Sequence, residues 1–194
     1  KYLTADEYLS GNVREKLEWA KRSAEQYPED YAAHVQALER VQPVDLTASE
    51  IAVRLGATWL PPKIVEQFMF ELFSTSNRSR WNIHVHYFQY TGEWNVEGKS
   101  YDKGNIKAHN TYGTKRINGY QIIEETLNLR DVRIYDYETD HHGNRIPVLN
   151  KKETAIAQGK QELIKQVFQD WIWKDPQRRQ ELVRSYNERF NAIR

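Results

Sequence analysis

The spacing of apolar residues changes along the chain, and this change constrains the fold more than any other feature of the sequence. From Asn12 onward, apolar residues return at steps of three and four, as in a helix that buries one face. Between Trp81 and Tyr90 they alternate, as in a strand with one buried face. The helical spacing returns after Asn150. A chain that changes period in this way predicts an α+β fold.

The same pattern divides the 194 residues into three predicted regions. Residues 1–73 are expected to form a helical subdomain, residues 74–149 a small antiparallel or mixed sheet with one or two helices, and residues 150–194 two C-terminal helices. The chain starts at Lys1 instead of a Met, and no Gly or Pro stop signal follows Arg189. We therefore expect a piece of a longer protein, with a further domain after residue 194.

Capping residues and turn residues place the individual elements. Asn12 and Asn150 each precede a Glu by three residues, which is typical of a helix start, and Asp175 stands before a Pro that suits the first helical turn. Helices are expected over 12–27, after Pro28, over 47–56, after Pro61, over 117–127, after Asn150 and after Asp175. Strands are expected over 81–90, 93–97, 131–137 and 146–148.

The composition excludes several classes of protein. The chain has no Cys, so disulfides, thiolate nucleophiles and Cys-ligated zinc are excluded. No apolar run approaches the roughly 20 residues that a membrane-spanning helix needs. We therefore expect a cytoplasmic protein with no membrane partner.

Motifs for catalysis or cofactor binding are incomplete. The run from Gly92 to Ser100 nearly forms a phosphate-binding loop, but five residues separate its glycines where the motif needs four. His84 and His86 share one face of the predicted strand, yet they supply only two metal ligands. No nucleophile elbow is present. We expect no catalytic residue, no metal and no cofactor.

The segment Thr47–Gly56 resembles the first helix of a helix-turn-helix DNA reader, with the next helix starting at Pro61. A recognition helix must present polar or basic side chains to the bases, whereas residues 61–73 are largely apolar. A packed helical corner is therefore favoured, with groove reading as the alternative.

The strongest candidate for binding is a basic stretch over residues 99–116. Its net charge is +4, and tyrosines and a histidine interrupt the basic residues. Cations that contact phosphates, combined with rings that stack on bases, are typical of single-stranded nucleic-acid binding. A solvated surface is the alternative. The predicted nucleic-acid-binding residues are Lys99, Lys103, Lys107, Tyr112, Lys115 and Arg116.

Several long strings are similar to one family. They are ASEIAVRLGATWLPP (48–62), GKSYDKGNIKAHNTYGTKR (98–116), ETLNLRDVRIYDY (125–137), LNKKETAIAQGKQELIKQVFQDWIWKDPQRR (149–179) and YNERFN (186–191). From about residue 40 onward, the chain resembles a segment of the very large helicase/DNA-methyltransferase fusion proteins of bacterial conjugative elements and phages. In that family an N6-adenine methyltransferase domain comes first and an SNF2-like superfamily 2 helicase follows. The resemblance places this segment just upstream of the helicase motor.

The resemblance implies the biology of a parent protein, ATP-driven DNA remodelling coupled to methylation on mobile DNA. It carries over no catalytic residue, because the helicase phosphate loop, its acidic box and the methyltransferase motif do not occur in this sequence. The first hypothesis is a noncatalytic accessory domain that contacts DNA through the basic loop. The alternative is a structural adaptor that packs between the methyltransferase and helicase domains without binding DNA, through an exposed surface of Trp171, Trp173 and Phe190.

Overall fold

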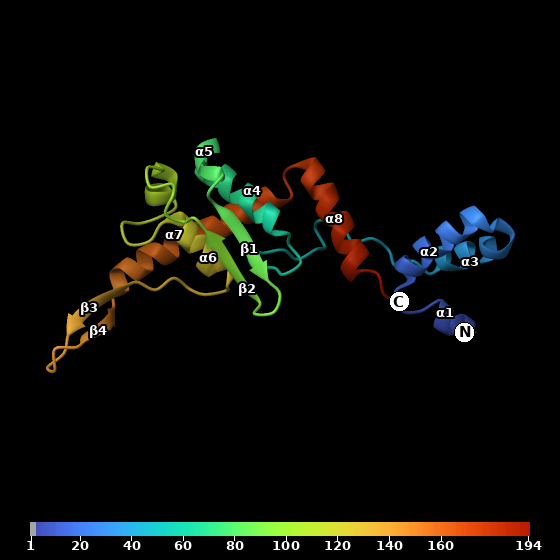
Figure 1. Ribbon diagram of the computed structural model, residues 1–194, viewed down its shortest axis with the longest axis horizontal. Helices are drawn as coiled ribbons and strands as arrows, with labels where there is room; N and C mark the ends of the chain where they lie inside the picture. The colour runs from blue at the N-terminus through green and yellow to red at the C-terminus, as the bar shows by residue number, and fades with distance from the viewer. Residues whose placement is uncertain (1–2) are drawn as a thin grey trace. The chain divides into compact units, whose positions relative to one another are not determined.

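The computed structural model describes residues 3–194, which form α-helices and two small antiparallel sheets (Figure 1). The predicted α+β class is confirmed. The chain divides into two compact units, residues 1–52 with 175–194 and residues 53–174. We call them the helical unit and the mixed unit. Among the described residues, no helix combines the length and the apolar character needed to cross a membrane.

The helical unit contains α1 (Ala5–Tyr8), α2 (Val13–Gln26), α3 (Pro28–Arg40) and α8 (Pro176–Phe190). The helices expected after Asn12, Pro28 and Asp175 are all present. The Asn12 side chain accepts a hydrogen bond from the Glu15 N–H, so this predicted cap forms. Leu17, Ala20 and Leu38 form the core between α2 and α3.

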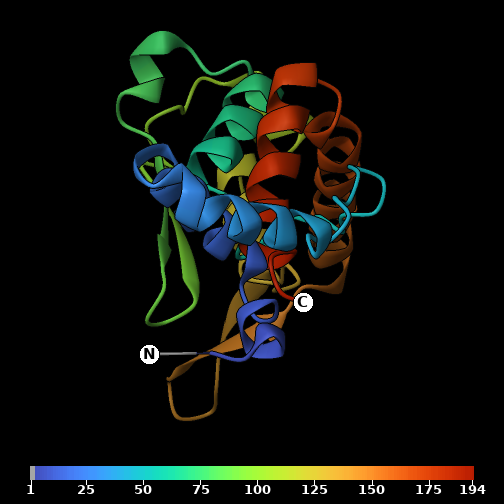
Figure 2. The same ribbon diagram turned by 90° about the vertical axis from the view of Figure 1, so that its right-hand side faces the viewer.

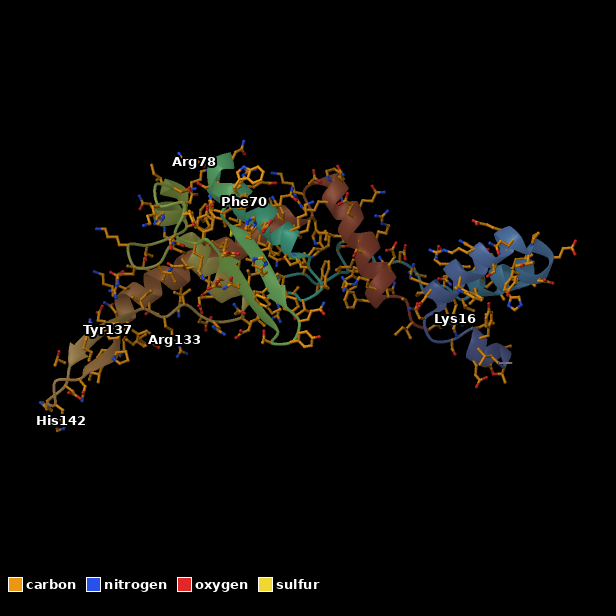
Figure 3. The ribbon with its side chains drawn as sticks, in the orientation of Figure 1. Lys16, Phe70, Arg78, Arg133, Tyr137 and His142 are labelled. Carbon is orange, nitrogen blue, oxygen red and sulfur yellow. The ribbon has the colours of Figure 1, made fainter. Side chains whose placement is uncertain are left out.

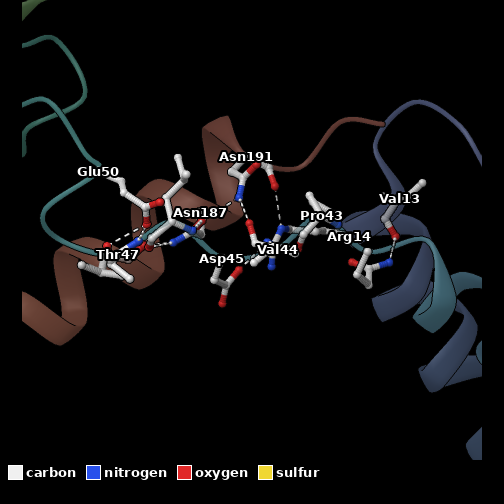
Figure 4. Close-up of polar contacts among 12 residues, drawn as sticks. Val13, Arg14, Pro43, Val44, Asp45, Thr47, Glu50, Asn187 and Asn191 are labelled. Carbon is white, nitrogen blue, oxygen red and sulfur yellow. Dashed lines mark hydrogen bonds and ion pairs between the residues drawn. The ribbon is translucent and has the colours of Figure 1, made fainter.

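Residues 43–50 lie between α2 and α8 and are held mainly by side chains that bind backbone groups (Figure 4). Asn187 of α8 accepts a hydrogen bond from the Leu46 N–H at 2.8 Å and donates one to the Leu46 carbonyl at 2.9 Å. Arg14 forms an ion pair with Asp45 and donates to the Asn191 carbonyl at 2.8 Å. The connection therefore joins the first and last parts of the chain within this unit.

The helix expected over Thr47–Gly56 is absent, so that prediction is wrong. The segment forms turns, and the Glu50 carboxylate accepts hydrogen bonds from both the N–H and the hydroxyl of Thr47. These bonds from Thr47 to Glu50 are one half of a capping box, and they close a single turn. The backbone of the preceding residue, Leu46, is bound to the Asn187 side chain instead of starting a helix. Without this helix, the helix-turn-helix alternative lacks its first element.

Helix α8 ends at Phe190, although no stop signal marks that position. The chain then turns back along the start of α2, where Gly11 and Arg194 exchange backbone hydrogen bonds of 2.9 and 3.1 Å. This short antiparallel pairing is centred on Asn12 and Ile193.

The mixed unit begins with α4 (Pro62–Phe73), α5 (Asn77–Arg80) and the hairpin of β1 (His84–Phe88) and β2 (Glu93–Glu97). It continues with a π-helix, η1 (Lys107–Thr111), α6 (Gly119–Leu127), the hairpin of β3 (Tyr135–Thr139) and β4 (Arg145–Leu149), and α7 (Lys151–Ile172). The helix after Pro61, the strand pair around Gly92 and the helix after Asn150 match the sequence-based expectations. Helix α5 and η1 were not expected; η1 lies within the basic stretch over residues 99–116.

The core of the mixed unit lies between α4, α6, α7 and one face of the first hairpin. Ile83, Val85, Trp94 and Val96 are buried, and Val85 pairs with Val96. The alternation expected from the sequence is therefore present. Phe68 of α4 packs edge-on against Phe168 of α7, with ring centroids 5.1 Å apart.

The compact units differ from the predicted three-region division, whose boundaries follow residues 73 and 149. Helices α4 and α7 belong to the same unit as the sheets, because Phe68 and Phe168 bury each other. Helix α8 belongs with residues 1–52 instead of with α7, because Asn187 binds Leu46. Both groupings depend on contacts between residues far apart in the sequence.

The β3–β4 hairpin extends away from α4, α6 and α7 in two perpendicular views (Figures 1 and 2), and every residue of both strands is exposed. The strand expected from Asp131 begins only at Tyr135. The reason is that α7 side chains bind the preceding backbone: Gln161 accepts from the Val132 N–H at 3.1 Å, and Thr154 accepts from the Ile134 N–H at 2.9 Å.

Candidate nucleic-acid interface

The loop that follows β2 is fixed by a hydrogen-bond network around Asp102. Its carboxylate accepts from the Ser79 hydroxyl at 2.9 Å, from the Asn105 amide at 2.7 Å and from the Tyr120 hydroxyl at 2.7 Å. Ser79 lies on α5 and Tyr120 on α6, so one carboxylate joins two helices to the loop. A carboxylate with three donors is strongly held, because hydrogen bonds to a charged group are the stronger kind.

Tyr120 is the buried end of this network. Its side chain is fully buried, and its hydroxyl also lies 2.7 Å from the Thr75 hydroxyl. Burial raises the pKa of Tyr120 well above its ordinary value of 10.0; the Thr75 hydroxyl lowers this pKa, and Asp102 raises it further. The network therefore favours the neutral phenol.

We expect Tyr120 to make the stability of the mixed unit sensitive to alkaline pH. Because the folded state raises this pKa, its stabilising contribution is complete below pH 10.0 and is lost as the pH rises toward the folded-state pKa. Urea denaturation across this range should show a falling free energy of unfolding, with a shallower fall in Tyr120→Phe. Identical pH profiles for the two proteins would contradict the assignment.

Lys99, the first predicted binding residue, is engaged within the protein. Its ammonium lies 2.6 Å from both carboxylate oxygens of Glu124 on α6. The same carboxylate accepts from the Val96 N–H at 2.7 Å. Lys99 therefore neutralises a structural carboxylate and is a poor candidate for binding phosphate.

Arg116 and Tyr112 also have structural partners. The Arg116 guanidinium donates to the Asp136 carboxylate and to the Tyr135 carbonyl, both at 2.8 Å, and so ties the loop to β3. Tyr112 is half-buried, and its ring centroid lies 6.0 Å from that of Phe73. The structure thus explains these two residues by packing and pairing within the chain.

The remaining predicted residues, Lys103, Lys107 and Lys115, are exposed. The Lys107 ammonium donates to the Ser74 hydroxyl at 2.7 Å, a neutral partner that leaves its charge uncompensated. This bond places Lys107 beside the C-terminus of α4. Lys115 lies in the turn next to Arg116, on the part of the loop that contacts β3.

Two large aromatic side chains lie where α5 meets the loop. Trp81 directly follows α5 and is 82% exposed, and Tyr101 is 67% exposed. Their segments are in contact, because a Cβ on Gly98 would lie 1.8 Å from the Asn82 carbonyl oxygen. The Ser79–Asp102 bond fixes the same junction.

Exposed cations accompany these rings. Arg78 lies on α5 at the outer end of the α4–α5 corner (Figure 3) and is exposed. Lys103 follows Asp102 in the loop, and Lys107 bonds to Ser74 just before α5. We call the following residues the α5–loop surface: Arg78, Trp81, Tyr101, Lys103 and Lys107.

Sequence reasoning missed Arg78 and Trp81. Arg78 precedes the strand expected over 81–90 and Trp81 is its first residue, and nothing in the local spacing connects them with residue 101 or 103. The available signal was the helix cap, since Ser76 precedes Ser79 by three residues and accepts a hydrogen bond from the Ser79 N–H at 3.2 Å.

The histidines of β1 have carboxylate neighbours instead of a third metal ligand. His84 lies 3.6 Å from Glu66, and His86 lies 3.1 Å from Glu97. Within residues 3–194, no group of three or more His, Cys, Asp or Glu side chains has the arrangement of a metal site.

A family model described as "Domain of unknown function (DUF8437)" matches residues 54–192. The chain belongs to this family. The DUF8437 match contains the whole α5–loop surface and the β3–β4 hairpin, whereas α1, α2 and α3 precede it. Searches of the curated proteins and of the solved structures give no significant match.

Proposed function

We propose that this chain is a noncatalytic accessory domain that contacts single-stranded or unpaired DNA through the α5–loop surface. The observation that carries the proposal is the exposure of two rings and three cations on α5 and the loop, two segments joined by the Ser79–Asp102 bond. Rings supply stacking on bases of any sequence, and cations supply contacts to phosphates. A preformed frame reduces the entropy lost when these side chains bind.

The shape of the surface favours unpaired bases over duplex grooves. A groove reader needs a helix or strand ribbon that presents polar side chains to base edges. The cations and rings of this surface come instead from a single helical turn and a loop. Bases that are already unstacked can lie on Trp81 and Tyr101 without a cost for opening a duplex.

The resemblance to helicase/DNA-methyltransferase fusion proteins supports DNA as the ligand. In such a parent, this domain would hold a strand near the helicase motor while the flanking domains carry out ATP hydrolysis and methyl transfer. Its partners would then be DNA and the methyltransferase and helicase domains of the same chain, and it would need no cofactor of its own.

The structural adaptor remains the alternative function, but the surface suggested for it has changed. Trp171 is only partly exposed: its ring lies 5.2 Å from that of Phe68, and its Nε1 donates to Glu71 at 2.6 Å. Trp173 is half-buried, and of the three suggested residues only Phe190 is exposed. An adaptor would therefore need a different surface.

DNA binding by the α5–loop surface can be tested by fluorescence anisotropy with labelled oligothymidylate over a range of salt concentrations. We expect a steep fall of log K with log salt concentration for the unmodified chain. The triple variant Arg78→Ala, Lys103→Ala, Lys107→Ala should reduce the magnitude of this slope by about 2, because each lost phosphate contact accounts for roughly 0.7. Trp81→Ala should weaken binding by about 1–3 kcal/mol with an unchanged slope, because stacking involves no counterions.

A charge-matched control separates a local effect from a change in net charge. Lys115→Ala combined with Lys151→Ala and Lys152→Ala removes three exposed cations elsewhere in the mixed unit. We expect nearly unchanged affinity for this variant. Equal losses for the two triple variants, or no binding by the unmodified chain at low salt, would exclude the proposal.

A further inference from the structure

The β3–β4 hairpin lacks the packing that normally stabilises a sheet. All of its strand residues are exposed, including the large apolar side chains of Tyr137 (62%), Ile146 (43%) and Leu149 (42%). A sheet of only two strands is marginally stable in water, and a third strand adds both hydrogen bonds and side-chain contacts. The hairpin therefore gains stability from any strand that pairs with it.

The two edges of the hairpin differ. Tyr137 pairs with Pro147. The hydrogen bonds at the two ends of the ladder join even-numbered residues: the Asn150 N–H donates to the Ile134 carbonyl, and the Asp140 N–H donates to the Asn144 carbonyl. In an antiparallel pair these bonds alternate, so the backbone groups of odd-numbered residues point outward. The outer edge of β4 therefore presents Pro147, which has no N–H and blocks pairing there.

The outer edge of β3 is open. Its outward-pointing residues are Tyr135, Tyr137 and Thr139, and the Tyr135 carbonyl already accepts a hydrogen bond from Arg116 at 2.8 Å. Residues 137–139 carry neither a proline nor a side chain that covers the edge. An exposed strand edge of this kind is a template for pairing with another chain.

The charges on β3 select the partner. Asp136 and Glu138 lie on one face of the strand, and residues 135–149 carry a net charge of −2 with the histidines neutral. Arg116 already neutralises Asp136, so Glu138 is the carboxylate that this face offers to a partner. If two copies paired antiparallel about Tyr137, Asp136 of each copy would lie opposite Glu138 of the other. Two carboxylates directly opposite each other are destabilising, and the Arg116 ion pair at Asp136 reduces this cost, so the edge favours a partner that brings cations over a second copy. The same charge disfavours DNA.

We propose that the open edge of β3 binds an extended polypeptide segment in which basic and apolar residues alternate. The incoming strand would bond to the backbone of Tyr137 and Thr139. Its Lys or Arg side chains would lie on the face that carries Glu138, and its apolar side chains would lie on the face of Tyr135 and Tyr137. Main-chain bonds provide affinity in this mode, and the alternating side chains provide specificity.

The test uses the full chain and a labelled short peptide in which lysine and valine alternate, with binding followed by fluorescence anisotropy. Tyr137→Pro removes the outward N–H of β3 together with the Tyr137 ring and should weaken binding by about tenfold or more. Arg145→Pro places the same residue on the outward edge of β4, at the start of that strand. It also removes the Arg145 guanidinium, which lies 5.1 Å from the Tyr137 ring centroid, so both variants lose this contact. Arg145→Pro should leave the affinity within about twofold.

Glu138→Lys tests the charge rule without a change to the backbone. We expect this variant to bind the lysine peptide more weakly and to bind a matched glutamate–valine peptide that the unmodified chain rejects. The proposal is wrong if Tyr137→Pro and Arg145→Pro behave alike, if Glu138→Lys does not change the preference, or if the hairpin self-associates. Backbone amide exchange of β3 and β4 confirms that each variant keeps the hairpin.

Discussion

Replacement of Gly98 by Ala is expected to lower the free energy of unfolding of the mixed unit by about 3 kcal/mol or more. Gly98 has a φ of +74°, where an L side chain is strained, and the added Cβ would lie 1.8 Å from the Asn82 carbonyl oxygen and 2.8 Å from its carbon. Both obstacles are backbone atoms, so no side-chain rotation relieves the clash. Urea denaturation measures the loss.

Two other glycines provide graded controls. Gly92 has a φ of +70° with no atom within 4 Å of the added Cβ, so Ala there should cost only about 1 kcal/mol from the backbone conformation. Gly104 also has open space and does not adopt the left-handed conformation, so Ala there should be nearly neutral. If Gly98→Ala lowered the free energy of unfolding no more than Gly92→Ala does, the close approach of the loop to Asn82 would not contribute to stability.

The Gly98 variant also bears on the α5–loop surface. The close approach of residues 82 and 98 and the Ser79–Asp102 bond both hold the segment of Trp81 against the loop that carries Tyr101. A folded Gly98→Ala protein should therefore bind oligothymidylate more weakly than Gly92→Ala, even though neither substitution removes a ring or a charge.

Local signals explain why so much of the secondary structure could be predicted. The helix caps Asn12, Asn150 and Asp175 each accept a hydrogen bond from a backbone N–H three residues later, so their information lies within one turn. The alternation in β1 and β2 similarly depends on residues two apart. The same logic failed at Thr47, where a capping pair forms but no helix follows.

The candidate site was only partly predictable, because its electrostatics are non-local. Lys99 and Arg116 look like free cations in the sequence, yet their carboxylate partners Glu124 and Asp136 lie 25 and 20 residues further along the chain. Lys103 and Lys107 have no such partner among the described residues. A count of charges over residues 99–116 cannot separate the paired cations from the available ones.

The division into compact units was unpredictable for the same reason. Helices α7 and α8 are separated only by residues 173–175, yet they belong to different units. Polar contacts connect α8 with residues 43–50 of the helical unit, and polar side chains leave no periodic trace in the sequence.

Asn187→Ala tests that assignment and should lower the free energy of unfolding of the helical unit by about 2–3 kcal/mol. Asn187 is 2% exposed, and its side chain satisfies both the N–H and the carbonyl of Leu46. Truncation leaves both backbone groups without their partners. Amide exchange in α2, α3 and α8, measured beside that of the mixed unit, resolves which unit loses stability.

Asn191→Ala is the matched control, because it removes the same amide one turn later on α8. Its Nδ2 donates to the carbonyl of Val44, an 88% exposed residue, and to the Asn187 Oδ1 at 2.8 Å. Water can replace the first bond and Asn187 keeps its bonds to Leu46, so the cost should stay below about 1 kcal/mol. A larger loss at 187 than at 191 means that burial of the Leu46 backbone docks the helix. Equal losses would instead mean that apolar contacts of α8, such as those of Leu182, dock it and that Asn187 merely fills the space beside them.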